Sequence, residues 1–283
     1  MTGTKIVKLK LDDEGQADRL PKLKEGIVDD VIRMYEKNNS QDIDLFRPFV
    51  RQDIQGFNVS PKQLREILSK LESNFGSSSG YALEAAVVLT YLIMNSTHKE
   101  FTIRPLQRLD RLGEMLGEGK TIIVEGKLGH MAGAGMDGGT IIVKGDTMGE
   151  TGCAMKRGKI VIDGNTGGLT GWKMEGGTLE VRGNVAKKLG LQMSGGSIKV
   201  VGDAEDDGGE FMEGGNIEVF GNVGDRLGMN MKGGEIHIKG KCGKNTGLRM
   251  NEGKLLVDGR IASISKEYHS GEIWEAGVRR RPK

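Results

Sequence analysis

The sequence predicts a mainly β protein, a parallel β-helix of about eight 19-residue coils, preceded by an α-rich N-terminal domain. Three observations predict this fold. Methionine recurs every nineteen residues, at Met136, Met155, Met174, Met193, Met212, Met231 and Met250. Glycine, with 46 of 283 residues, has more than double its usual share but no collagen-like Gly-X-Y period. Two aliphatic residues alternate with polar ones inside each repeat, which is typical of a half-buried strand.

Residues 1–116 are predicted to form the α-rich domain. Near its start, "KIVKLKL" alternates apolar and basic residues, which predicts one strand over residues 5–11. Apolar residues at helical spacing predict a helix over residues 27–37. Both elements come before the two longer helices that the sequence predicts.

Two longer helices and a short one complete this domain. Ser60 as N-cap, Pro61 at the first helical position and Gln63 closing a capping box predict the start of the first. The second, over residues 82–94, is apolar on nearly all sides and is expected at the centre of the domain. We expect the short helix to begin near Pro105.

From residue 117 to residue 260, each repeat has the same residue types in the same places, which we number as slots from the methionine at slot 0. Slots 3 and 9 are Gly in all seven Met-containing repeats. Slot 5 is Ile or Leu and slot 7 is Val or Ile, so they form one buried strand face. One short strand in nineteen residues predicts coils that stack in parallel, with like side chains above like. At roughly 4.8 Å per coil, the stack would be about 35–40 Å long.

Glycines are expected at the corners of the coils, where the chain needs positive φ or close approach. Slot 10 follows the corner with Asp146, Asn165, Asn184, Asp203 and Asn222, residue types that bond locally to turn backbone. Residues 117–135 are an imperfect first coil, because terminal repeats must close the stack. Residues 261–283 are predicted to be a C-terminal cap with Tyr268 and Trp274, followed by a solvated basic tail.

The second half of most repeats reads Gly-x-x-Gly-x-x-x-Gly, as in "GNTGGLTG" at 164–171 and "GNVGDRLG" at 221–228. This resembles the GXGXG β-helix family, which includes the C-terminal domain of the glutamate synthase large subunit and the β-helical subunit of formylmethanofuran dehydrogenase. The resemblance covers residues 117–260 and implies a right-handed β-helix that acts as a scaffold. It also implies that this chain holds no cofactor, and that flavin, iron–sulfur or metal centres belong to partner subunits.

Composition narrows the classes of partner. The chain carries 41 basic and 39 acidic residues, a net charge of +2, which favours neither nucleic acid nor membrane. The longest apolar run is too short to span a bilayer, and no secretory signal is recognisable, so we expect a cytoplasmic protein. The two cysteines, Cys153 and Cys242, lie five coils or roughly 24 Å apart and are expected to be free thiols.

Few residues are candidates for chemistry. Ser78 lies in "GSSSG", a Gly-x-Ser-x-Gly frame, but a nucleophile elbow needs a strand before the serine and a helix directly after it. A linker between two helices fits better. The segment "GAGMDG", residues 133–138, has the glycine spacing of a dinucleotide site but leads into a strand. The methionine stripe is expected to fill the core rather than bind a soft metal.

The remaining candidates are the histidines His98, His130, His237 and His269, all expected on the surface. Extended flat faces without pockets suit docking better than catalysis. We therefore expect a non-catalytic scaffold or interaction protein that docks partner subunits of a larger complex or associates with itself. The alternative is a stand-alone, esterase-like hydrolase that uses Ser78 or a cleft between the N-terminal domain and the first coils.

Overall fold

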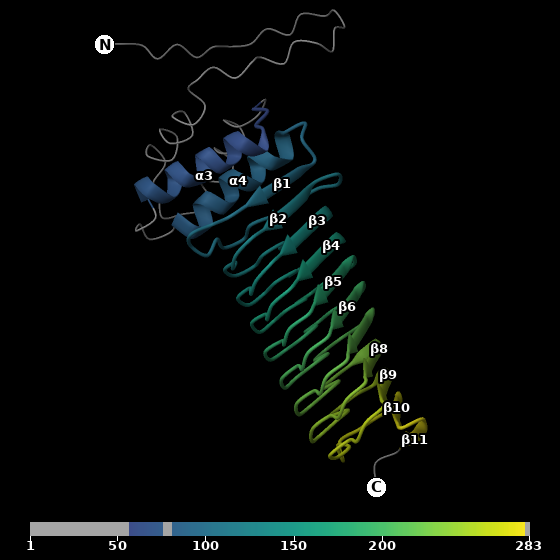
Figure 1. Cartoon of the computed structure of the whole chain (residues 1–283). Helices are drawn as coiled ribbons and strands as arrows, with labels where there is room; N and C mark the ends of the chain where they lie inside the picture. The colour runs from purple at the N-terminus through teal and green to yellow at the C-terminus, as the bar shows by residue number, and fades with distance from the viewer. Residues whose placement is uncertain (1–56, 76–80, 281–283) are drawn as a thin grey trace, which may run out of the picture.

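Eleven strands wind into one parallel β-helix in the computed structural model, which describes residues 57–75 and 81–280 (Figure 1). The strands lie in the sheet in chain order. Strands β1 to β10 pair in parallel, and β11 turns back antiparallel on β10. The expected strand at 5–11 and helix at 27–37 lie outside the described residues.

Strands β1 to β10 occupy slots 4 to 7 of their coils, and some begin earlier. The side chains at slots 5 and 7 point inward, so Ile236 and Ile238 are fully buried while His237 between them is partly exposed. The strands are β1 (Glu100–Ile103), β2 (Thr121–Val124), β3 (Asp137–Val143), β4 (Arg157–Ile162), β5 (Thr178–Val181), β6 (Ser197–Val200), β7 (Asn216–Val219), β8 (Lys232–Ile238), β9 (Glu252–Val257), β10 (Glu272–Glu275) and β11 (Val278–Arg280).

Helices α3 (Pro61–Phe75) and α4 (Tyr81–Asn95) lie beside β1 at the N-terminal end of the β-helix (Figure 1). The predicted capping box is confirmed. The backbone N–H of Ser60 donates to Gln63 Oε1 at 2.9 Å, and the N–H of Gln63 donates to Ser60 Oγ at 3.3 Å. Helix α4 is buried as expected, with Leu89 fully covered.

The short helix expected near Pro105 is absent, because that segment belongs to the β-helix. Strand β1 pairs with β2, with Phe101 opposite Ile122. Residues 110–115 form turns in which Arg111 and Met115 have positive φ, at 58° and 55°, as residues at the same place in later coils do. The β-helix therefore has about nine turns, one more than the sequence pattern predicts.

The methionine ladder fills the core, as predicted, and it explains the glycine at slot 3. All seven repeating methionines are fully buried. The methyl groups of Met155, Met193, Met212 and Met231 lie under the slot-3 glycines of the next coils. A Cβ atom on Gly215 would come within 2.7 Å of Met193 Cε, and one on Gly234 within 2.7 Å of Met212 Cε. Met and Gly thus recur together because one occupies the space that the other leaves.

The slot-10 side chains bond between coils rather than within their own turn. Asn184 Oδ1 accepts the backbone N–H of Asp203 at 2.8 Å, and Asp203 Oδ1 accepts that of Asn222 at 2.6 Å. The expectation of local turn bonding was wrong, because these side-chain oxygens accept backbone N–H groups of the next coil. The result is a side-chain ladder parallel to the long axis.

The last coil is closed by the C-terminal segment. Tyr268 packs against the core and donates its hydroxyl to the carbonyl of Gly271 at 2.7 Å. Trp274 lies on β10, partly exposed, with Nε1 donating to Glu272 Oε2 at 3.0 Å. Strand β11 is exposed and forms ion pairs with β10 through Arg279 and Arg280.

Candidate interaction surfaces

The residues expected to carry chemistry do not come together. Ser78 lies outside the described residues, so its prediction is untested. His237 Nε2 lies 2.9 Å from Asp258 Oδ1 on the outer strand face, and His130 and His269 are exposed on other coils. Within residues 57–75 and 81–280, no group of three or more His, Cys, Asp or Glu side chains could hold a metal ion.

Both cysteines are free thiols, as predicted, and the structure shows that both are buried. Burial raises the pKa of Cys242 to about 11, and the Thr246 hydroxyl lies 3.1 Å from its sulfur. Burial also raises the pKa of Cys153. A thiol that stays protonated and covered at neutral pH is a poor nucleophile, so both act as small packing residues.

The glycine-rich segment at 133–138 serves packing and leads directly into β3. Gly133 has φ +66°, and a Cβ atom there would come within 2.5 Å of Ile160 Cδ1. A dinucleotide site binds phosphate through the free N–H groups at the N-terminus of a helix. No helix follows this segment, so it lacks those groups.

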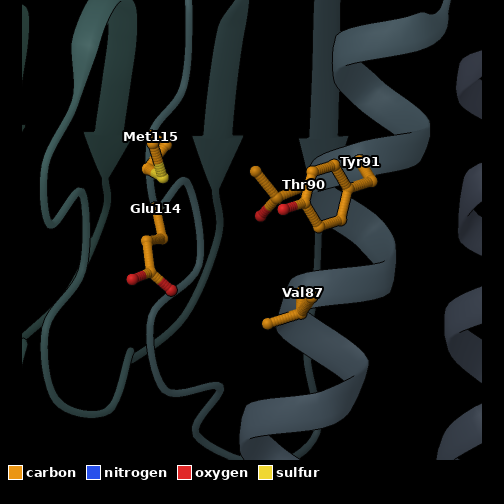
Figure 2. A pocket seen from close by; sticks show the side chains of 5 residues that line it. All are labelled: Val87, Thr90, Tyr91, Glu114 and Met115. Atoms are coloured by element: carbon orange, nitrogen blue, oxygen red, sulfur yellow. The ribbon is translucent and has the colours of Figure 1, made fainter. Parts of the chain in front are cut away.

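A small cavity lies where α4 meets the first coil (Figure 2). It is lined by Val87, Thr90 and Tyr91 of α4 and by Glu114 and Met115 of the coil. Its volume of about 20 Å³ holds about one water molecule, which is too little for a substrate. Thr90 Oγ1 accepts the backbone N–H of a first-coil glycine at 2.9 Å, so the place is a structural joint.

The outer face of the strands is a regular surface. Its slots 4, 6 and 8 carry side chains of both charges, which form ion pairs between coils such as Arg182–Asp163 at 2.6 Å. About half-way along the stack, Val201 and Phe220 directly follow β6 and β7 and are 46% and 43% exposed. The ammonium group of Lys199 lies 4.8 Å from the centre of the Phe220 ring. We call this surface the strand face.

A groove of about 370 Å³ runs along a different edge of the β-helix. Its walls are the side chains at slots 18 and 1 of successive coils, namely Lys173, Glu175, Gln192, Ser194, Phe211, Glu213 and Lys232. We call it the edge groove. The sequence pattern missed it because slots 18 and 1 vary from coil to coil, and a ladder of unlike side chains leaves no period.

Comparison with known proteins gives one result that covers most of the β-helix. The protein-family model described as GXGXG motif matches residues 109–273, more than half of the chain. The match begins in the coil before residue 117 and ends in β10. A comparison with curated proteins finds none that matches. In the described part of the chain, no helix is long and apolar enough to cross a membrane.

Proposed function

The chain belongs to the GXGXG motif family, and on that premise we propose that it is a non-catalytic scaffold that docks protein partners on its strand face. The observation that supports this most is the exposure of Val201 and Phe220, which directly follow β6 and β7 about half-way along the stack of coils. Aromatic residues are enriched at the centres of protein interfaces, where they contribute much of the binding energy. A charged rim around an apolar centre is the usual composition of such a surface.

The rigidity of the strand face also favours docking over catalysis. Each inner strand bonds to two neighbours in register, for instance Glu218 opposite Lys199 and His237. A partner therefore meets a surface that loses little conformational freedom on binding. Side chains on such a face vary without disturbing the core, so partner specificity can reside in slots 4, 6 and 8.

By family resemblance, the partners belong to a complex like glutamate synthase or formylmethanofuran dehydrogenase. In such an assembly the flavin, iron–sulfur or metal centres are held by the partners, and this chain binds none. The complex works in the cytoplasm. Self-association through the same face is the simpler form of the proposal.

The test is native purification of the full chain from its own cells, followed by native mass spectrometry and identification of subunits and metals. We expect a discrete complex of fixed stoichiometry. The variant Phe220→Ala should lose at least about tenfold in affinity for the identified partner, as an interface-centre aromatic does. Phe211→Ala, which removes an exposed phenyl ring on another surface, is the matched control and should bind normally. A monomer at all concentrations, without partners, contradicts the proposal.

The hydrolase alternative has its own test. The proposal expects no turnover of p-nitrophenyl butyrate by the purified chain. An esterase activity that Ser78→Ala abolishes while the thermal midpoint stays unchanged would replace the scaffold function by an enzymatic one.

A further inference from the structure

We infer that the edge groove binds an uncharged oligosaccharide, with the Phe211 ring as its stacking platform. This inference is independent of the proposed docking function, because the edge groove and the strand face lie on different slots of the coils. The residues that line the groove belong to the coils of β4 to β8, whose order along the stack can be followed in Figure 1.

The backbone of the groove walls restricts the kind of ligand. The N–H groups of Gln192 and Phe211 donate to carbonyls of the next coil at 2.8 Å. Those of Ser194 and Glu213 donate to carbonyls of the preceding coil at 2.9 and 2.8 Å. With these donors used, an extended peptide cannot add as a strand, since strand addition needs free main-chain donors and acceptors. A ligand must therefore be recognised by side chains.

The side chains offer hydrogen bonds without net charge. Two lysines, Lys173 and Lys232, are balanced by two glutamates, Glu175 and Glu213, so the groove attracts neither anions nor cations strongly. Glu213 and Lys232 form an ion pair at 2.8 Å. Among the described residues, none forms a hydrogen bond or ion pair with the Glu175 carboxylate. The wall thus presents acceptors and donors in alternation, which suits a ligand rich in hydroxyl groups.

The central part of the wall is held in place by an aromatic residue outside the groove. Trp172 Nε1 donates to Gln192 Oε1 at 3.2 Å, which leaves the Gln192 amide nitrogen as a donor. Lys173 lies over the same indole, with Nζ 5.0 Å from the ring centre. These contacts hold the polar groups in place before a ligand arrives, which lowers the entropic cost of binding.

Phe211 is the unusual residue in the groove. Its φ is +54°, a conformation unfavourable for a bulky side chain, and it is 37% exposed among polar neighbours. Ala154 occupies the same slot of an earlier coil with φ +51°, so neither the coil nor its core requires an aromatic residue. An exposed ring between hydrogen-bonding groups fits a ligand with polar edges and an apolar face. A pyranose ring has this composition.

The spacing of the coils supports a chain of such rings. Successive wall residues are separated by roughly 4.8 Å along the axis, which is close to the length of one pyranose unit in an extended β-linked chain. From Lys173 to Lys232 the groove covers three coil steps, roughly 14 Å. It therefore has room for about three sugar rings in a row.

The experiment is isothermal titration of the full chain with cellotetraose, chitotetraose and, as a charged comparison, tetragalacturonate. We expect at least one of the two neutral tetramers to bind with a Kd in the millimolar range or tighter, and tetragalacturonate to bind more weakly. Phe211→Ala should weaken binding about tenfold or more. Phe220→Ala, the matched loss of an exposed ring from the strand face, should leave the Kd unchanged.

A second variant blocks the groove without touching the core. Ser194 is exposed, so Ser194→Trp should fold normally and abolish binding. Circular dichroism and the thermal midpoint check the fold of each variant. The inference is overturned if neither neutral tetramer binds, if tetragalacturonate binds as tightly as they do, or if Phe211→Ala and Phe220→Ala have equal effects. None of these results bears on partner docking at Phe220, so the two proposals can fail separately.

Discussion

Two adjacent glycines in one coil should respond to alanine with opposite changes in stability. Gly208 has ordinary φ, and a Cβ atom there would lie 3.4 Å from Leu227 Cδ1 and 3.5 Å from Val223 Cγ1, which is normal contact. Gly209 has φ +67°, and a Cβ atom there would lie 2.2 Å from Ile236 Cδ1, which is a clash. The first site has room for a methyl group, and the second has none.

The magnitudes follow from these distances. Gly208→Ala reduces the freedom of the unfolded chain, worth about 0.4–1 kcal/mol, and buries one methyl group, worth about 0.8 kcal/mol. The expected result is an increase of about 1–2 kcal/mol in the free energy of unfolding. Gly209→Ala costs about 1–2 kcal/mol for the left-handed conformation and about 1–3 kcal/mol for overpacking. The expected result is a decrease of about 2–5 kcal/mol.

Urea unfolding followed by circular dichroism measures both changes, provided that the m-values of the three proteins agree. Because the two sites are in the same coil, each variant serves as the control for the other. The packing argument is refuted if the two unfolding midpoints move in the same direction, or if Gly208→Ala lowers the midpoint.

Three further predictions concern the core, the side-chain ladder and the buried thiol. Met193→Ala should lower the free energy of unfolding by about 2–5 kcal/mol and Met193→Leu by less than about 1.5 kcal/mol; equal losses in urea unfolding would contradict its role as a core filler. The Asn184 side chain accepts the backbone N–H of Asp203, so Asn184→Ala should speed hydrogen exchange at that amide. Asn184→Asp keeps an acceptor oxygen at this place and should preserve the protection of the Asp203 amide. The pKa of Cys242 is raised from 9.0 to about 11, so the unfolded thiol ionises first and the free energy of unfolding should fall by about 2 kcal/mol from pH 9 to pH 11. Cys242→Val, the residue type of Val185 and Val223 at this slot, should remove that part of the pH dependence, and an unchanged slope would exclude the thiol as its source.

The repeating part of the fold could be predicted because every inner coil has the same neighbours above and below. Identical surroundings select identical residues, so Met193 and Gly215 recur as a pair along the stack. The same reasoning fails at the ends. Glu100 pairs with Thr121, 21 residues later, and Lys254 pairs with Glu272, 18 residues later. A search at a fixed period of nineteen therefore misses the coil before residue 117.

The interaction surfaces could be predicted less well than the core. Outward side chains are not fixed by packing, so slots 18 and 1 show no common residue type, and the proximity of Gln192, Phe211 and Glu213 appears only in three dimensions. The coil spacing correctly predicted that Cys153 and Cys242 are too far apart for a disulfide, whereas their burial appears only in the structure.

The equal length of the inner coils has a consequence for how the gene can change. Removing residues 194–212 would bring Met193 directly before Glu213. The methionines, the slot-3 glycines and the slot-10 side chains of the remaining coils would still lie above one another. Duplicating the same nineteen residues would lengthen the stack by roughly 4.8 Å in the same way. The distance between two sites on one face can therefore change in single-coil steps while each site keeps its own residues.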